Sequence, residues 1–216
     1  RLQEASRAEI EPPLAVRLRR LDALAALVRD NIDAFAAAIA ADFGHRSREE
    51  TRLLEIFPSL EGIRHARRHL RRWMRPQRRP VSFWFQPGRA QGRMQPLGVV
   101  GVIVPWNYPL YLAIGPLTAA LAAGNRAMVK MSEFTPATAA LLADLVTRHF
   151  SDDEVLVVQG DAAVAQAFSH LPFDHLLFTG STAVGHHVMR AAADHLTPVT
   201  LELGGKSPVI VAPDFP

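Results

Sequence analysis

The sequence predicts an α/β fold in which helices cover both faces of a doubly wound parallel sheet. From residue 98 onward, short runs that are apolar throughout, such as "VVGVIV" and "HLLFTG", alternate with helical stretches. Apolar strands of this kind are typical of parallel sheets buried on both faces, and their alternation with helices is typical of βαβ units. With 216 residues, 49% of them hydrophobic, the chain is large enough to bury such a core.

Residues 1–75 are expected to form N-terminal helices of the same domain. Apolar residues recur at intervals of three and four from Leu14 to Ile39, and Gly44 is expected to end this helical segment. A second helix is predicted from about Leu60 to Trp73. It carries arginines at positions 64, 67, 68, 71 and 72, which favour a solvated helix face over a nucleic-acid patch.

Residues 76–97 change in character. Prolines punctuate the segments "VSFWF" and "GRAQGRMQPLG", a pattern typical of an extended arm or hairpin. Such an arm buries little surface against its own domain, so we expect it to contact another subunit. A simple linker is the alternative.

Residues 98–208 are assigned to the doubly wound core. The strand "VVGVIV" precedes a helix that closes at Gly124, and "AMVK" precedes a helix over 136–150 with Thr135 at its cap and Pro136 in its first turn. The next strands are "VLVVQG" and "HLLFTG", each followed by a helix, the second of which begins at Ser181. "VTLELG" and "PVIVA" are the last predicted strands, and residues 209–216 are expected to begin a further domain.

The composition narrows the classes of function. The absence of cysteine excludes disulfides, thiolate metal sites and a cysteine nucleophile within this chain, and we assign no metal site. The net charge of +3 rests on arginine, because only Lys130 and Lys206 among the 24 basic residues are lysine. Such a bias is typical of codon composition, so we expect no nucleic-acid partner.

The chain opens on Arg1 without a recognisable signal or transit peptide, and we expect a cytoplasmic protein. Residues 94–125 carry no charge and are long enough to suggest a membrane span. Four prolines and Asn107 interrupt this stretch. A buried strand followed by a buried helix explains it better, so no membrane span is expected.

Ligands of open parallel sheets gather at the carboxyl ends of the strands, where this chain places "VPWN", "VKMSE", "VQGD", "FTGS" and "LELGGK". In "FTGSTAVG", Gly180 and Gly185 flank the turn into a helix. Small residues there let an anion such as a pyrophosphate approach the N–H groups of the helix N-terminus. An ordinary tight turn explains the pattern equally well.

Four further residues carry polar groups that suit catalysis or binding. Lys130 and Glu133 could share the two hydroxyls of a ribose, although a surface ion pair has the same spacing. Glu202 could act as a general base if burial raised its pKa, or it could face solvent with Lys206 as its counter-ion. Asn107, held between prolines and aromatic residues, could stabilise an oxyanion with its amide or cap the following helix.

Together these segments resemble the aldehyde dehydrogenase superfamily. "VPWNYPL", "KMSE", "FTGSTAVG" and "LELGGKSP" follow one another in the family's order and at its separations, and the resemblance covers nearly the whole chain. The wording of "FTGSTAVG" and "HLTPVTLELGGKSP" is most similar to the class 3 and coniferyl-type branch, which takes fatty or aromatic aldehydes. The resemblance implies a Rossmann-like domain that binds NAD, with NADP as the alternative.

The resemblance also implies roles for individual residues. Asn107 would donate its amide to the oxyanion of a thiohemiacetal, and Glu202 would activate the water that hydrolyses a thioester. Lys130 and Glu133 would hold the adenine ribose, and the carbonyl of Leu203 would meet the nicotinamide amide. The other residues that the resemblance places at the cofactor are Val104, Trp106, Gly180, Ser181, Thr182, Val184 and Gly185.

Three further expectations follow from the resemblance. Residues 81–96 would supply an oligomerisation arm for a homodimer or a larger homo-oligomer. Met131 replaces the proline of the commoner "KPSE", which would leave the ribose-binding loop less rigid. The family's nucleophile is a cysteine some tens of residues beyond the glutamate, so this chain is expected to be the cofactor-binding part of an enzyme whose catalytic domain follows. A non-catalytic nucleotide-binding or assembly module is the alternative.

Overall fold

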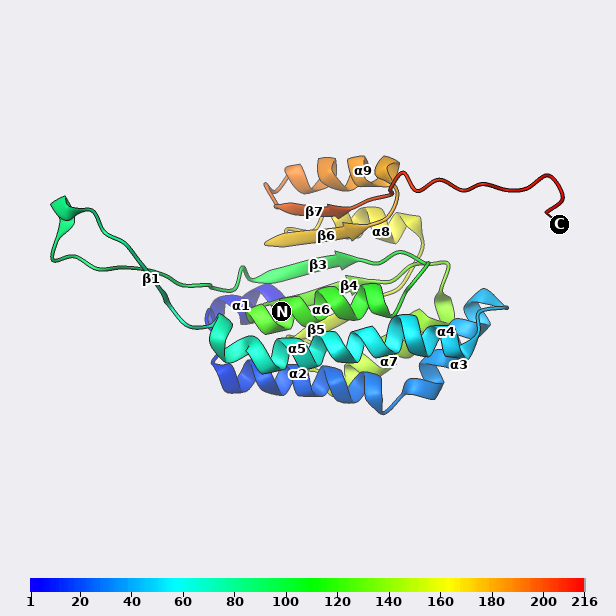
Figure 1. Cartoon of the computed structure of the whole chain (residues 1–216), viewed down its shortest axis with the longest axis horizontal. Coiled ribbons are helices and arrows are strands. Elements are labelled where there is room, and N and C mark those ends of the chain that lie inside the picture. Colours follow the sequence, from blue (N-terminus) through cyan, green and yellow to red (C-terminus); the bar gives the residue numbers. More distant parts are fainter. Residues whose placement is uncertain (216) are drawn as a thin grey trace.

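The computed structural model of the chain describes residues 1–215 and confirms the predicted α/β architecture (Figure 1). Five parallel strands form one sheet in the order β5-β4-β3-β6-β7. Their bounds are β3 Val99–Ile103, β4 Arg126–Lys130, β5 Val155–Val158, β6 His175–Thr179 and β7 Val199–Glu202.

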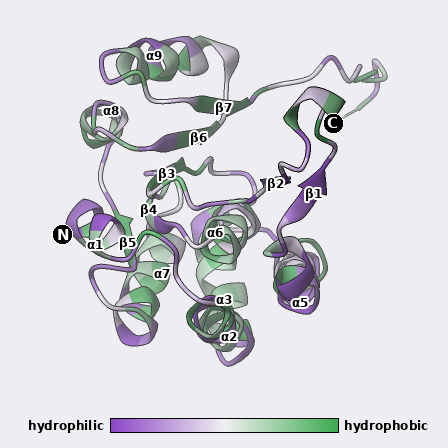
Figure 2. Cartoon of the chain, turned by 90° about the vertical axis from the view of Figure 1, so that its left-hand side faces the viewer, coloured by the Kyte–Doolittle hydropathy of each residue, from purple (hydrophilic) through white to green (hydrophobic). Residues whose placement is uncertain are grey.

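The helices form two layers, one on each face of the sheet (Figure 2). One layer contains α2 Leu14–Arg29, α3 Ile32–Phe43, α5 Phe57–Trp73, α6 Tyr111–Ala123 and α7 Pro136–His149. The other contains α1 Leu2–Ala8, α8 Ala162–Ser169 and α9 Thr182–Ala193. Each layer shares its own hydrophobic core with the sheet face that it covers.

The strand β3 shows how the sequence supplies both cores. Val100 and Val102 belong to the core beneath α6 and α7, whereas Val99 and Ile103 belong to the core beneath α8 and α9. This alternation is the two-residue period of a strand buried on both faces. At Gly101 a Cβ would lie 2.7 Å from the Phe173 ring, so the second core has no room for a side chain there.

The N-terminal helices differ in detail from the prediction. The helical segment predicted over Leu14 to Ile39 is divided between α2 and α3, because the Asn31 side chain donates to the Leu27 carbonyl (2.9 Å) at the end of α2. Gly44 ends α3 in the left-handed conformation (φ 74°), as expected. The helix predicted from about residue 60 begins earlier, because α4 Arg48–Thr51 and a π-helical turn, η1 Arg52–Ile56, run directly into α5.

Two segments extend away from the body of the molecule (Figure 1). The first is a hairpin whose strands β1 Gln77–Arg79 and β2 Ala90–Gly92 pair antiparallel, with a 3₁₀ turn, η2 Phe83–Phe85, at its tip. The second follows β7, and here the prediction of a strand at "PVIVA" was wrong. Val209 and Ile210 are 84% and 96% exposed, and no neighbouring strand in the described chain receives their backbone hydrogen bonds.

No helix within residues 1–215 combines the length and the apolar character that a membrane crossing requires. The uncharged stretch that suggested one is instead divided between β3 and α6, with a turn between them. Gly124 ends α6 in the left-handed conformation (φ 92°), as the sequence predicted.

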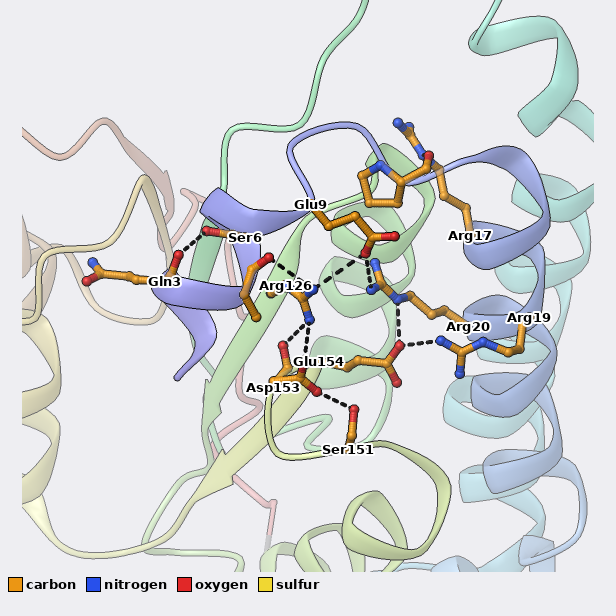
Figure 3. Close-up of polar contacts among 12 residues, drawn as sticks. Gln3, Ser6, Glu9, Arg17, Arg19, Arg20, Arg126, Ser151, Asp153 and Glu154 are labelled. Atoms are coloured by element: carbon orange, nitrogen blue, oxygen red, sulfur yellow. Dashed lines mark hydrogen bonds and ion pairs between the residues drawn. The ribbon is translucent and has the colours of Figure 1, made fainter.

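A cluster of arginines and carboxylates closes the amino-terminal edge of the sheet (Figure 3). Arg20 is 2% exposed, and its Nε donates to Oε1 of Glu154 over 2.9 Å. Arg19 pairs with the same carboxylate. Glu9 accepts hydrogen bonds from Arg20 (3.4 Å) and from Arg126 (3.5 Å) at the start of β4. The cluster therefore ties α1 and α2 to the sheet.

Replacement of Glu154 by Gln should destabilise the fold by about 3 kcal/mol, because the buried Arg20 loses its nearer carboxylate and keeps only the 3.4 Å contact with Glu9. Burial opposes ionisation of Glu154, but Arg19 and Arg20 outweigh it and hold the pKa of this carboxyl below its usual value. The stabilisation is therefore present above the unfolded-state pKa and is lost as the pH falls toward the lowered folded-state pKa. When thermal unfolding is measured at a series of pH values, the stability of Glu154→Gln should not show this loss at acid pH.

The control for this variant is Asp144→Asn, which breaks an exposed ion pair with Arg148 on α7. Such pairs contribute about 0.5 kcal/mol or less, so its unfolding curve should stay close to that of the parent. Equal stability losses in Glu154→Gln and Asp144→Asn would show that the buried cluster does not stabilise the fold.

Candidate functional site

The strand order places the topological switch point of the sheet between β3 and β6. The chain passes from β3 outward through β4 to β5, and then returns to the other side of β3 for β6 and β7. The crevice outside the carboxyl ends of the strands, where the order reverses, is the usual ligand site of such sheets. Val104 follows β3 at this point and Gly180 follows β6.

The turn from β6 into α9 requires glycine for steric reasons. A Cβ at Gly180 would lie 2.5 Å from the Phe178 ring, and a Cβ at Gly185 would lie 2.9 Å from Cδ2 of Leu203. Gly185 brings the first turn of α9 against the residue that follows β7. The Gly180 N–H donates to the Glu202 carbonyl (3.0 Å), so the ends of β6 and β7 are joined as well.

The N-terminus of α9 presents free hydrogen-bond donors at the crevice. Ser181 caps the helix, since its Oγ accepts the Val184 N–H (3.3 Å). The N–H groups of Thr182 and Ala183 have no acceptor among residues 1–215. Free N–H groups and the helix dipole favour an anion here, which agrees with the anion-binding interpretation of this turn.

Lys130 ends β4 with its ammonium group nearly enclosed. Its side chain is 1% exposed, and Nζ donates to the carbonyls of Met131 (2.7 Å) and Gly160 (2.8 Å). Burial lowers the pKa of Lys130, while Glu133 and Asp161 oppose this change. Since an ammonium has three donors, one N–H remains for a ligand or for Glu133, whose Oε2 lies 3.9 Å away.

Met131 replaces the proline that the family commonly carries after the lysine. Its N–H donates to the Val158 carbonyl (3.0 Å), a bond that proline cannot make, and its side chain is 1% exposed. The lower rigidity expected of the loop stays a prediction, and this hydrogen bond acts against it.

Glu202 lies at the end of β7 with its side chain exposed. The described part of the chain therefore does not bury this carboxylate in the way that the general-base interpretation required. Lys206 forms no ion pair with Glu202 within residues 1–215, so the counter-ion interpretation fails there. Its carbonyl accepts the Gly180 N–H, so Glu202 lies beside Gly180 at the carboxyl ends of the strands.

Asn107 lies in the turn between β3 and α6, and its side chain is exposed. Trp106, 53% exposed, packs against Phe43 with 6.1 Å between ring centroids. The alternative interpretation, in which Asn107 caps α6, is not found in the structure. The N–H groups of Leu110 and Tyr111 at the start of that helix donate instead to Oε2 of Glu55 (2.8 and 3.2 Å).

A groove of about 610 Å³ lies between α5 and α6, away from the glycine turn. Its walls are largely apolar and include Pro58, Ala66 and Trp73 of α5 and Tyr111, Gly115 and Ala119 of α6. Tyr111 is the first residue of α6, so the groove begins beside the turn that carries Asn107.

Comparison with known proteins decides the family. The sequence profile of the aldehyde dehydrogenase family matches residues 3–215. The chain belongs to this family. It is 59% identical over 216 residues to the probable coniferyl aldehyde dehydrogenase of Pseudomonas aeruginosa, covering 100% of this chain and 45% of that protein. It is 56% identical over 200 residues to the coniferyl aldehyde dehydrogenase of Pseudomonas sp. strain HR199, covering 92% and 41%.

Solved structures of aldehyde dehydrogenase relatives share the fold. AldH of Staphylococcus aureus in a substrate-bound state superposes with a TM-score of 0.92 at 34% identity, covering 98% of this chain and 46% of that one. PnpE in complex with nicotinamide adenine dinucleotide superposes with a TM-score of 0.83 at 30% identity, covering 95% and 42%. The chain therefore spans less than half the length of these family members.

Most of the site residues predicted for an aldehyde dehydrogenase lie along one edge of the sheet. Hydrogen bonds join Val104 to the carbonyl of Lys130 (3.0 Å) and Gly180 to that of Glu202. No contact in the described chain joins Asn107 to Glu202. The sequence analysis did not identify Gly160 or the pair Glu55 and Arg46. Glu55 shares a helix face with the small residues Ser59 and Ala66, and a lone carboxylate on such a face is a signal that could have indicated it.

Proposed function

We propose that the full-length protein oxidises an aldehyde to the carboxylic acid with a nicotinamide dinucleotide, and that this chain supplies the cofactor-binding part. The observation that carries the proposal is the α9 N-terminus at the crevice. It offers two free N–H groups beside a glycine whose Cβ position is closed by the Phe178 ring. Backbone donors that an anion can approach this closely fit a pyrophosphate.

The other residues at this edge fit the remaining parts of such a cofactor. The free N–H of Lys130 and the exposed carboxylate of Glu133 are a donor and an acceptor suited to ribose hydroxyls. Thr182, Val184 and Gly185 would line the turn, Val104 and Trp106 the opposite side, and the Leu203 carbonyl would accept from the nicotinamide amide. When bound, the nicotinamide supplies the acceptor for the hydride that leaves the substrate.

The chain's own residues then have distinct tasks. Asn107 donates a side-chain N–H to the oxygen on which negative charge develops during attack on the aldehyde. Glu202 accepts a proton on a carboxylate oxygen from the water that releases the acid. The nucleophile is a cysteine that this chain does not contain, so it belongs to the remainder of the full-length protein.

We favour NAD over NADP because the Glu133 carboxylate would repel a phosphate on the adenine ribose. The substrate class that we favour is an aromatic, coniferyl-type or fatty aldehyde. Support comes from the coniferyl aldehyde dehydrogenases among the relatives and from the apolar groove that begins at Tyr111.

We also propose a homodimer or a larger homo-oligomer and a cytoplasmic location. The hairpin arm supports assembly, because Phe83, Trp84 and Phe85 at its tip are 82%, 86% and 71% exposed. Apolar patches of this kind mark protein interaction sites.

Calorimetric titration of the full-length protein with NAD is expected to show binding that depends on Lys130. Lys130→Met keeps the length of the side chain and removes the ammonium, so the Kd should rise about tenfold or more. Arg148→Met removes an exposed cation from α7 instead and should leave the Kd unchanged. The absence of heat with both NAD and NADP would overturn the proposed function.

A further inference from the structure

The N-terminus of α6 is held by a carboxylate from a distant part of the chain. Glu55, in the π-helical turn η1, is 0% exposed, and its Oε2 accepts the N–H groups of Leu110 (2.8 Å) and Tyr111 (3.2 Å). Burial raises the pKa of the Glu55 carboxyl, while the two N–H donors and Arg46 oppose this change. Asp42 holds the N-terminus of α7 in the same way, so a cap from a distant carboxylate is not particular to α6, and what distinguishes Glu55 is its second partner, Arg46.

Arg46 connects this carboxylate to the turn that carries Asn107. Its Nη1 donates to Oε1 of Glu55 (3.2 Å) and to the backbone carbonyl of Asn107 (2.7 Å). The guanidinium carbon lies 3.8 Å from the centroid of the Phe43 ring and 4.9 Å from that of Tyr108. The planar group is therefore fixed by two acceptors and two aromatic rings, and its side chain is 10% exposed.

These contacts hold the turn at its centre and at both ends. Before the turn, the Val104 N–H donates to the Lys130 carbonyl (3.0 Å), and after it the Leu110 N–H donates to Glu55. Arg46 binds the carbonyl of Asn107 between these two points. These three hydrogen bonds limit the movement of the turn, so the side-chain amide of Asn107 projects from a fixed base.

We propose that Glu55 and Arg46 are positioning residues that fix the Asn107 amide for the oxyanion that develops on the substrate. The inference rests on the proposed function, in which Asn107 is that donor. Glu55 and Arg46 act through the Asn107 backbone. They would raise the rate of the first chemical step without adding to cofactor affinity, because orientation of a donor acts on the transition state.

A purely structural role accounts for these contacts less well. Buried ion pairs can often be replaced by apolar side chains without loss of stability. A serine, threonine or aspartate within the turn could also cap α6 without a partner from a distant part of the chain. Neither replacement would bind the carbonyl of Asn107. The arrangement found is one that couples the cap of α6 to the position of Asn107 through a single guanidinium.

Glu55→Gln in the full-length protein tests the inference. The glutamine carbonyl can still accept from Leu110, but its NH₂ group cannot accept from Arg46. The rate of the first-turnover NADH burst should fall about tenfold or more, since a small misplacement of a catalytic group can cost about 10²-fold, with the Kd for NAD unchanged. Arg52→Gln, which removes an exposed ion pair with Asp33 from the same π turn, should leave the burst rate unchanged.

A double variant separates positioning from general structural damage. If Glu55 acts through Asn107, adding Glu55→Gln to Asn107→Ala should slow the burst by less than about twofold beyond Asn107→Ala alone. Multiplicative losses, or an unchanged burst in folded Glu55→Gln, would overturn the inference. If Glu55→Gln does not fold, Arg46→Gln decides by the same two criteria, because it leaves Glu55 in place to cap α6. An unchanged burst in Asn107→Ala alone would instead refute the oxyanion role in the proposed function.

Discussion

The 216-residue chain by itself is expected to form no NADH from coniferaldehyde, benzaldehyde or medium-chain aldehydes. A hydride does not leave an aldehyde carbon readily until a nucleophile has added to the carbonyl, and a thiolate is well suited to this because it also leaves well afterwards. The chain has no cysteine. Ser181 and Thr182 carry hydroxyl groups at the N-terminus of α9, but Ser181 Oγ already caps that helix. Within residues 1–215 no basic side chain forms a hydrogen bond with either hydroxyl.

The comparison for this experiment is the full-length protein under the same conditions. The full-length protein, which includes the sequence beyond Pro216, should form NADH. Replacement of the nucleophilic cysteine in that sequence by alanine should abolish NADH formation again. Binding of NAD by the isolated chain serves as the check that it is folded. Steady NADH formation by the purified chain, free of the full-length protein, would overturn the assignment of the nucleophile.

Asn107→Ala in the full-length protein is expected to lower kcat about 10²-fold or more, as the loss of a single oxyanion donor does in other enzymes. The side chain is exposed at the centre of a turn whose backbone is held by Arg46 and Glu55, so its removal should not disturb the fold. Steady-state kinetics with coniferaldehyde should place the loss in kcat and in kcat/KM, because the interaction is strongest in the transition state.

Asn107→Asp is the matched variant, since it keeps the shape of the side chain and removes the N–H donor. It should be at least as slow as Asn107→Ala. Asn31→Ala, which removes a side-chain amide from the end of α2, is the control and should retain full kcat. A change confined to the affinity for NAD would mean that Asn107 serves the cofactor rather than the reaction.

The architecture could be predicted because local signals and the global fold agree. The apolar strands β3 and β6, the left-handed Gly44 and Gly124, and the cap at Ser181 each follow from a few neighbouring residues. "PVIVA" carries the same apolar signal, yet a strand also needs a neighbour for its backbone, and a short sequence pattern contains no information on that neighbour.

The candidate site could be predicted at the strand ends and not beyond them. Lys130 ends β4 and Gly180 directly follows β6, so their place at the carboxyl ends of the strands follows from topology. Glu55 does not, because its partners are the N–H groups of residues 110 and 111, which only the packing of α5 against α6 brings near. For the same reason the sequence could not show that a distant carboxylate, and not Asn107, accepts the first N–H groups of α6.

The π-helical turn Arg52–Ile56 sets how many residues separate Arg46 from Glu55 along the chain. A π turn holds about one residue more than an α turn over the same rotation, so the helices on either side keep their relative orientation although the chain is one residue longer. Deletion of one residue within this turn would let it return to a plain α-helix with Arg46 and Glu55 in place, whereas the same deletion in the regular part of α5 would rotate the residues before it by about 100°. When related sequences are aligned, a one-residue gap within the π turn is therefore compatible with the contact between Arg46 and Asn107, and a one-residue gap in the regular helix after it is not.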